Sequence, residues 1–219
     1  MKAGSRTAVA AQPERSTDRR DALLKAAAEV FFEQGYAGTS IDAIIERAGG
    51  SKRNIYSAFG NKQGLFSAIV TQSADKALST LTIDETQGRD LQRTLTSFGR
   101  RLMDIYMSPT LIGIYRIAVT EANRFPDLVK AFYEQGPGRA ASRLAEVLEA
   151  AGRRGEVSVN DCSRAAGHFV GMIRDNLHLQ VVLGLRPPPS SREVNAAVES
   201  AVEIFLNGVR TAPAKRRRP

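Results

Sequence analysis

Apolar side chains recur every three or four residues along almost the whole of this 219-residue chain. That spacing places them on one face of an α-helix. No stretch alternates apolar and polar residues over enough β-branched positions to predict a strand. With 42% apolar residues, the chain also carries enough hydrophobic side chains for an ordinary packed core. The sequence therefore predicts an all-α globular fold.

Polar capping residues, together with breaks at glycine and proline, divide this pattern into separate helices. The first helix is expected over 17–34, where a glycine ends it. Thr39 forms a capping-box pattern with Asp42, and Ser51 and Asn61 are good N-caps for the two helices that follow. The later helices are expected over residues 90–107, 110–123, 126–151, 161–184 and 191–209.

Two short motifs refine the later helices. Gly136, Pro137 and Gly138 should kink or split the helix that contains them, because proline removes a backbone donor and crowds the preceding turn. Ser190 and Glu193 repeat the capping-box pattern, so we expect the last helix to start there.

Positive charge is concentrated at the two ends of the chain. The formal net charge is +8, of which residues 1–64 contribute +3 and residues 214–219 contribute +4. A basic end suits a polyanion such as DNA, although charge that merely aids solubility has the same appearance. Residues 1–15 and 211–219 are predicted to be disordered tails, because they bury too little apolar surface to offset the entropy of ordering. Either tail could touch DNA phosphates or only keep the chain in solution.

Several classes of protein are excluded by what the sequence lacks. Cys162 is the only cysteine, so no disulfide within the chain and no thiolate metal cluster can form, and a reducing compartment is expected. Core packing is the simpler role for Cys162, with redox sensing as the alternative. No apolar run approaches the roughly 20 residues that span a bilayer. We expect a cytoplasmic protein, neither secreted nor membrane-embedded, with no metal site and no cofactor.

Two short helices joined by Gly49 and Gly50 have the dimensions of a helix-turn-helix. The second opens with the sequence SKRN at 51–54, and its first turn could enter the major groove, where lysine or arginine reads guanine and asparagine reads adenine. Helix starts at Ser51 and Lys62 also present backbone N–H groups that favour a phosphate oxygen. The alternatives are a solvated helix face or a helix-turn-helix that contacts protein.

The stretch from about Asp18 to Asp75 resembles the DNA-binding domain of the tetracycline-repressor (TetR) family of bacterial transcriptional regulators. The likeness rests on LLKAAAEVFFEQGY, on TS and AGGS around the turn, and on YSAF before KQGLF. It implies a three-helix DNA-binding domain over 16–77, with the helix-turn-helix at about 40–60. The residues that the resemblance implies at the DNA are Thr39, Ser51, Lys52, Arg53, Asn54, Tyr56 and Lys62.

Two residues depart from the pattern of that family. Gly50 stands where an apolar residue is usual, and we expect it to loosen the helix packing by about 1 kcal/mol. Ala58 stands where a phosphate-contacting histidine is common, so one backbone contact is expected to be missing. The residues that the resemblance implies for the small core are Phe31, Ile41, Ile45, Ile55 and Phe59.

Residues 78–210 are expected to form a second helical domain that binds an effector and dimerises. The sequence LIGIYRIAVTEANRFPDLVKAFYEQGP, followed by RLAEVLEAAGRRGEV, resembles the C-terminal domain called AefR-like. The last helix carries an apolar stripe, and in the TetR family it pairs with the preceding helix and their copies in a four-helix dimer interface. Packing of the stripe within its own domain is the alternative. The stripe consists of Val194, Ala197, Val198, Ala201, Val202 and Phe205.

A ligand cavity is expected among the middle helices, lined by aromatic or adaptable side chains near a few polar groups. For each candidate, ordinary core packing is the alternative. Glu121, if buried, would favour a cationic ligand. The candidates are Met103, Tyr106, Tyr115, Glu121, Phe132, Met172 and Asn176.

These expectations combine into one hypothesis of function. A homodimer binds a palindromic site on double-stranded DNA, associated with the bacterial nucleoid, and represses transcription until a small, largely apolar effector molecule releases it. An enzyme is the first alternative, but the sequence offers no nucleophile with a base, no metal-ligand spacing and no phosphate-binding glycine loop. A helix-turn-helix that docks protein instead of DNA is the second, and activation instead of repression is a variant of the hypothesis itself.

Overall fold

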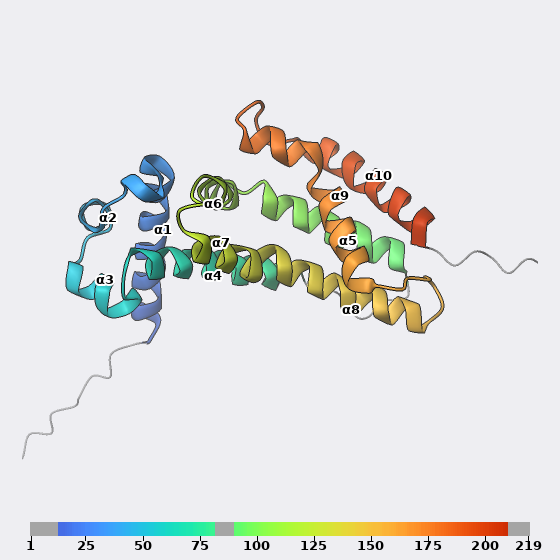
Figure 1. Cartoon of the computed structure of the whole chain (residues 1–219), viewed down its shortest axis with the longest axis horizontal. Helices are drawn as coiled ribbons and strands as arrows, with labels where there is room; N and C mark the ends of the chain where they lie inside the picture. Colours follow the sequence, from blue (N-terminus) through green and yellow to red (C-terminus); the bar gives the residue numbers. More distant parts are fainter. Residues whose placement is uncertain (1–12, 82–89, 210–219) are drawn as a thin grey trace, which may run out of the picture. The chain divides into compact units, whose positions relative to one another are not determined.

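The computed structural model describes residues 13–81 and 90–209 of the chain (Figure 1). These residues form helices joined by turns, with no strand element among them, which confirms the all-α prediction. They divide into two compact units, of which the first ends at Ile69 and the second begins at Val70. Residues 1–12 of the first predicted disordered tail and all of the second, 211–219, lie outside the described residues.

The first unit contains α1 (Pro13–Gly38), α2 (Ile41–Ala48), α3 (Lys52–Phe59) and the beginning of α4 (Lys62–Thr80). Because α1 begins at Pro13, the end of the predicted disordered arm is helical, and proline fits the first turn of a helix. The helix also continues past its predicted stop with a bend at Gly35, whose φ of 72° is a conformation that glycine adopts without strain.

Aromatic rings form the centre of the first unit. Phe31, Tyr36 and Phe66 lie with their ring centroids 5.4 to 5.5 Å apart, in stacked and edge-to-face arrangements. Ile44 and Ile55 hold α2 and α3 on this centre and are almost completely buried. Phe31 and Ile55 were predicted in this role, whereas the other predicted core residues are only half-buried. These half-buried residues are Ile41, Ile45 and Phe59.

Side chains cap the short helices of this unit. The predicted N-caps Ser51 and Asn61 are confirmed, since each side chain accepts the backbone N–H three residues further on, at 3.3 and 2.8 Å. The start of α2 differs from the prediction. Its N-cap is Ser40, whose hydroxyl accepts the N–H of Ala43 at 3.1 Å, so the predicted cap at Thr39 is wrong by one residue.

The second unit is a bundle built from the rest of α4 and the later helices. α8 lies along α9, and α10 lies against both α5 and α9 (Figure 1). None of the described helices combines the length and the apolar character that crossing a bilayer requires. The later elements are α5 (Leu91–Tyr106), α6 (Pro109–Thr120), α7 (Pro126–Tyr133), the π-helical turn η1 (Glu134–Gly138), α8 (Arg139–Arg153), α9 (Cys162–Val182) and α10 (Ser191–Val209).

The predicted break around Pro137 takes the form of the π-helical turn η1. A π turn is wider than an α turn, and it accommodates the missing N–H and the bulk of the proline ring. Gly138 and Arg139 keep helical backbone angles, so α7, η1 and α8 follow each other as one helical path (Figure 1). The helix is therefore locally widened and not split.

A second irregularity, which the sequence did not predict, bends α9 at Asp175. Its backbone angles are φ 37° and ψ −172°, and it is the only residue other than glycine with a positive φ in the described ranges. A side chain makes this conformation costly, so the surrounding structure must hold it in place. The bend falls between Arg174 and His178, one helical turn apart along the sequence.

The apolar stripe of α10 is buried inside its own protomer. Val198 and Val202 are 1% and 2% exposed, and the ring of Phe205 packs edge to face on Phe169 of α9, with centroids 5.0 Å apart. Apart from Ala197, the residues of this stripe that were predicted at the dimer interface are therefore packed within the chain. Helical periodicity shows that a face is buried but not which surface covers it. The buried residues are Val194, Val198, Ala201, Val202 and Phe205, whereas Ala197 is half-buried.

Candidate functional site

The first turn of α3 presents polar side chains to solvent. Lys52, Arg53 and Asn54 are exposed, while Ile55 on the opposite face is buried and anchors the helix. Ser51 precedes them with extended backbone angles, and its side chain accepts the N–H of Asn54. The turn therefore combines donors, a capped helix start and positive charge on one accessible face, which is the chemistry that reads base edges and phosphates.

Tyr56 and Lys52 add to this face in different ways. Tyr56 is 48% exposed, so it belongs to the accessible face of α3. The Lys52 ammonium pairs with the Asp42 carboxylate at 2.9 Å, and that hydrogen bond raises the pKa of Lys52. Both partners of the pair are more than half exposed. An exposed ion pair contributes little to stability, so Lys52 can exchange Asp42 for a phosphate or a base at small cost.

Lys62 occupies a different place from the predicted phosphate contact. Its ammonium donates to the carbonyl oxygens of Tyr36 at 2.8 Å and Thr39 at 2.9 Å, and it lies 3.4 Å from that of Ala37. It also lies 4.7 Å from the centroid of the Tyr36 ring, in a cation–π contact. Three carbonyl groups thus take up the donors of Lys62. In the structure Lys62 therefore ties α4 to the end of α1.

Thr39 is likewise turned inward. It is 3% exposed, and its hydroxyl donates to the carbonyl of Gly35 at 2.8 Å. The same carbonyl also accepts the backbone N–H of Thr39 at 3.2 Å, so both donors of Thr39 bind the end of α1. The predicted DNA contact of the Thr39 side chain is therefore corrected to a structural role. An N-cap pattern alone could not separate Thr39 from its neighbour Ser40, which takes the exposed position.

The turn of the helix-turn-helix explains the unusual Gly50. Gly49 and Gly50 have φ of 73° and 102°, both in the region that side chains rarely adopt. An apolar residue at position 50 would strain this backbone, so glycine suits the turn as it is built here. The backbone thus gives a reason for glycine at this position, and the effect of Gly50 on helix packing stays a prediction. Ala58 is exposed on α3.

The second unit contains a cavity with mostly apolar walls and about 50 Å³ of free volume. A buried water needs roughly 10–15 Å³, so this volume admits only a few waters. Helix α4 supplies one wall with Val70, Ala74 and Leu78, and η1 supplies Gly136 and Pro137. The remaining lining residues are Ala77, Leu81, Leu102, Ile105, Tyr106, Leu111, Ile114, Tyr115, Phe132, Ala140, Arg174 and His178.

Three of the seven predicted pocket residues, Tyr106, Tyr115 and Phe132, line this cavity. The other four are not among its lining residues. Met103 is fully buried in the core, Met172 packs beside the core, Glu121 follows α6 half-buried, and Asn176 is exposed.

Sequence reasoning missed Arg174 and His178, which line the cavity from α9. A polar pair four residues apart on a largely apolar helix was the available signal. The bend at Asp175 lies between them, so helical periodicity could not place the two side chains.

The polar side chains of the cavity form a connected group. The His178 ring lies between those of Tyr106 and Tyr115, with centroid distances of 5.4 and 5.0 Å, and Tyr115 packs edge to face on Phe132 at 6.1 Å. The guanidinium of Arg174 lies 5.7 Å from the Tyr115 centroid. Burial lowers the pKa of His178 to about 4, with Arg174 acting in the same direction, so the imidazole is neutral at pH 7.

The hydroxyl of Tyr106 is buried without a hydrogen-bond partner in the described structure. Burial raises the pKa of this phenol to about 12, although the charge of Arg174 opposes the shift. Tyr106 is 8% exposed, so the unmet hydroxyl is held away from bulk solvent. A buried polar group without a partner costs free energy, and such groups often mark a place where a ligand binds.

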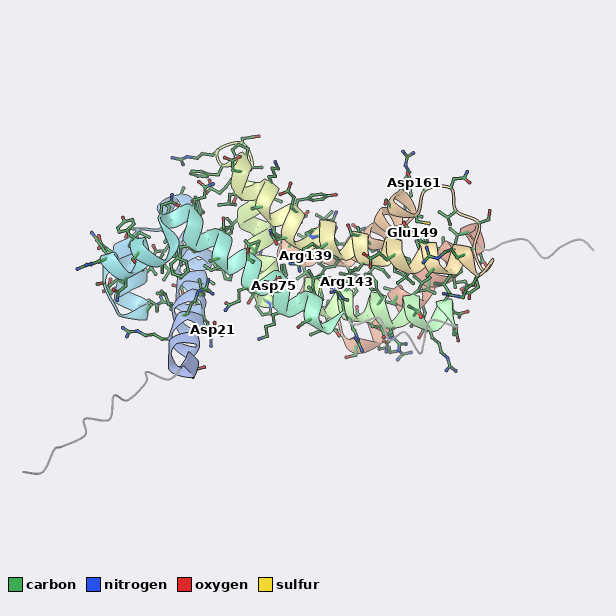
Figure 2. The ribbon with its side chains drawn as sticks, turned by 90° about the horizontal axis from the view of Figure 1, so that it is seen from below. Asp21, Asp75, Arg139, Arg143, Glu149 and Asp161 are labelled. Carbon is green, nitrogen blue, oxygen red and sulfur yellow. The ribbon has the colours of Figure 1, made fainter. Side chains whose placement is uncertain are left out.

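An ion pair lies beside this cavity but does not line it. Asp75 of α4 and Arg139 of α8 point toward one another, with oxygen and nitrogen 2.6 Å apart (Figure 2). The pair neutralises the Asp75 carboxylate and ties the cavity helix α4 to α8. Within the described ranges, no group of three or more His, Cys, Asp or Glu side chains could hold a metal ion.

Comparisons with known proteins agree for both units. Residues 23–69 match the family model described as bacterial regulatory proteins of the tetR family. Residues 93–208 match the model of the C-terminal domain of AefR-like transcriptional repressors. The two matches cover the helix-turn-helix and the cavity-bearing bundle respectively.

Individual relatives extend over almost the whole chain. The uncharacterized HTH-type transcriptional regulator YvkB of Bacillus subtilis is 27% identical over 195 residues, which are 89% of this chain and 98% of YvkB. The solved structure of the flavonoid-responsive regulator FrrA is 29% identical, with a TM-score of 0.76 over 90% of this chain and all of FrrA. A TetR transcriptional regulator from Agrobacterium tumefaciens is 26% identical, with a TM-score of 0.72 over 89% of this chain and 95% of its own.

Proposed function

This chain belongs to the TetR family of DNA-binding transcriptional regulators, which are not enzymes, and from that premise we propose that it is a repressor released from its operator by a small molecule. The observation that carries the proposal is the exposed turn of α3, in the same chain as a mostly apolar cavity. The first can hold DNA and the second a ligand.

The proposed DNA contacts come from α3. Arg53 and Asn54 reach base edges in the major groove, and Lys52 leaves Asp42 for DNA. Ser51 offers the backbone N–H groups of the helix start to a phosphate, and the exposed Tyr56 donates its hydroxyl to the backbone. Thr39 and Lys62 are left out of this set, since their polar groups bind carbonyls of the first unit.

The regulator acts as a homodimer on a palindromic operator, in this proposal. Two recognition helices related by a two-fold axis fit half-sites about one helical turn of DNA apart. Most of the α10 stripe is used within the chain, so the dimer is assigned to the adjacent face of the same helix, where Ala197 and Ile204 lie seven residues apart. Ile204 on that face is 62% exposed, which is unusual for an isoleucine unless another surface covers it.

Release by an effector is proposed to start at the cavity. Val70 and Ala74 of α4 line it, and the same helix begins at Lys62 in the first unit. A ligand that enlarges the cavity displaces α4, and a continuous helix carries such a shift along its axis. A coupling of about 1–3 kcal/mol weakens DNA binding by several-fold to a hundredfold. The relative FrrA is flavonoid-responsive by its name, which supports a small organic effector here.

Footprinting on genomic fragments with the purified chain tests the proposal directly. We expect protection of a palindromic site, saturation with an even number of protomers, and loss of protection for Arg53→Ala together with Asn54→Ala. Deletion of the coding sequence should raise transcription from the protected promoter. Lowered transcription would show an activator, and binding that depends on salt but not on sequence would remove the operator from the proposal.

A further inference from the structure

The end of the cavity lined by Tyr106, Arg174 and His178 is chemically unlike the rest of it. The α4 and η1 walls are apolar, whereas these three residues bring a hydroxyl, a guanidinium and an imidazole from α5 and α9. Of the described residues that line the cavity, Arg174 alone carries a formal charge at pH 7. The nearby carboxylate of Asp75 is paired with Arg139 and is not a lining group (Figure 2). The polar end of the cavity is therefore positive.

This polar end also has a donor that the protein leaves unused. The Tyr106 hydroxyl is buried and has no partner among the described residues, so folding leaves a hydrogen bond to be made. His178 is neutral at pH 7 and supplies one N–H donor from its ring. The His178 ring lies 5.4 Å from that of Tyr106, and the charge of Arg174 acts on both groups. Two neutral donors and one cation in the same part of the cavity suit an oxygen with negative charge, since hydrogen bonds to an ionised acceptor are the strongest kind.

We propose that the cavity binds an apolar weak acid, with its carboxylate or phenolate oxygen held by Tyr106, Arg174 and His178 and its hydrocarbon body against α4 and η1. This inference rests on the proposed function only in taking the cavity as the effector site. It excludes two other classes of ligand. A cation is repelled by Arg174, and a wholly apolar molecule leaves the Tyr106 hydroxyl buried and unpaired.

Irregular backbone beside the cavity explains how a free volume of about 50 Å³ can admit such a molecule. A ring of six carbons needs more volume, so the walls must move apart on binding. Two irregular segments border the cavity: η1, whose Gly136 and Pro137 line it, and the strained backbone of Asp175 between Arg174 and His178. π turns and strained residues have weaker or costlier local structure than a regular helix, so they yield first.

Binding of matched probes to the full chain tests the chemistry. The acids are 2-naphthoate and decanoate, which separate an aromatic from an aliphatic source, and 2-naphthamide, decanamide and 2-naphthylmethylamine are their neutral and cationic counterparts. The chain has no tryptophan, so naphthoate emission can be followed against little protein background, and calorimetry serves for decanoate. We expect at least one acid to bind at least tenfold more tightly than its amide, and the amine to bind most weakly.

Two substitutions locate the acid. Tyr106→Phe removes only the hydroxyl, and Arg174→Gln removes the charge, so each should weaken acid binding by about tenfold to a hundredfold while amide binding changes little. Tyr133→Phe and Arg143→Gln make the same chemical changes at exposed residues of α7 and α8 that do not line the cavity. These controls should bind the acids as the unmodified chain does.

The Tyr106→Phe variant also guards against a folding artefact. Its hydroxyl has no partner, so removing it should leave the melting temperature unchanged or raise it, and lost affinity then cannot be attributed to unfolding. Equal binding of acid and amide, no saturation by either acid at millimolar concentration, or acid binding that survives both substitutions would overturn the inference. Failure of the proposed function is a separate result, in which the acids bind but the ligand-free chain protects no DNA.

Discussion

Replacing Lys62 with methionine distinguishes a structural tie from a phosphate contact. Methionine keeps the length and the apolar stem of the side chain but removes the ammonium. In the structure this ammonium donates to the carbonyl groups of Tyr36 and Thr39 at 2.8 and 2.9 Å, and Lys62 is half-buried. A hydrogen bond that involves a charged group contributes about 1.5–3 kcal/mol. Because one partly solvated charge makes both bonds, we expect Lys62→Met to lower the free energy of unfolding by about 2–3 kcal/mol.

The assay pairs urea unfolding with the salt dependence of operator binding. Each phosphate contact that is lost changes the slope of log K against log salt by about 0.9. Lys62→Met should keep the slope of the unmodified chain at temperatures where it is folded, because its ammonium faces carbonyl groups. Arg53→Met is the matched control, since Arg53 is exposed on α3 and its loss should lower DNA affinity with a stability change within about 0.5 kcal/mol. A stable Lys62→Met variant with a reduced salt slope would refute this reasoning.

Three further predictions follow from the backbone, the cavity and α10. Gly50→Ala should destabilise the chain by about 1–3 kcal/mol in urea unfolding, because the φ of Gly50 is 102°. The control Gly152→Ala in α8 should be neutral or stabilising, and equal effects of the two substitutions would contradict the reasoning. The lowered pKa of His178 should make stability fall as pH drops from about 6.5 toward about 4, by up to about 1.4 kcal/mol per pH unit, since the unfolded chain takes up the proton first. The His178→Gln variant should lose this pH dependence of stability, and a variant that keeps it would show that another group is responsible. Val198→Asp should unfold the protomer, while Ile204→Asp should leave a folded monomer in light scattering. A Val198→Asp variant that is folded and monomeric would instead show that the dimer interface lies on the apolar stripe of α10.

The helix-turn-helix shows how far local sequence signals reach. Side-chain caps such as Ser51 and Asn61 act within three residues, so sequence alone predicted them correctly. Sequence alone also predicted that Lys52, Arg53 and Asn54 are exposed, because the repeat of polar and apolar residues along a short helix shows which of its faces is polar. The charged and capping residues closest to the turn were therefore readable without any tertiary information.

What only the tertiary structure decided depended on partners distant along the chain. Lys62 binds carbonyl groups more than twenty residues earlier, and the Val198 face of α10 packs on α5 and α9, so neither partner is visible in local spacing. Arg174 and His178 meet in the cavity across a bend that periodicity cannot predict. The sequence by itself determined the helices, the caps at Ser51 and Asn61 and the polar face of α3, because these depend on neighbours within about one turn. The structure decided which buried faces meet, because packing chooses partners by shape across the whole chain.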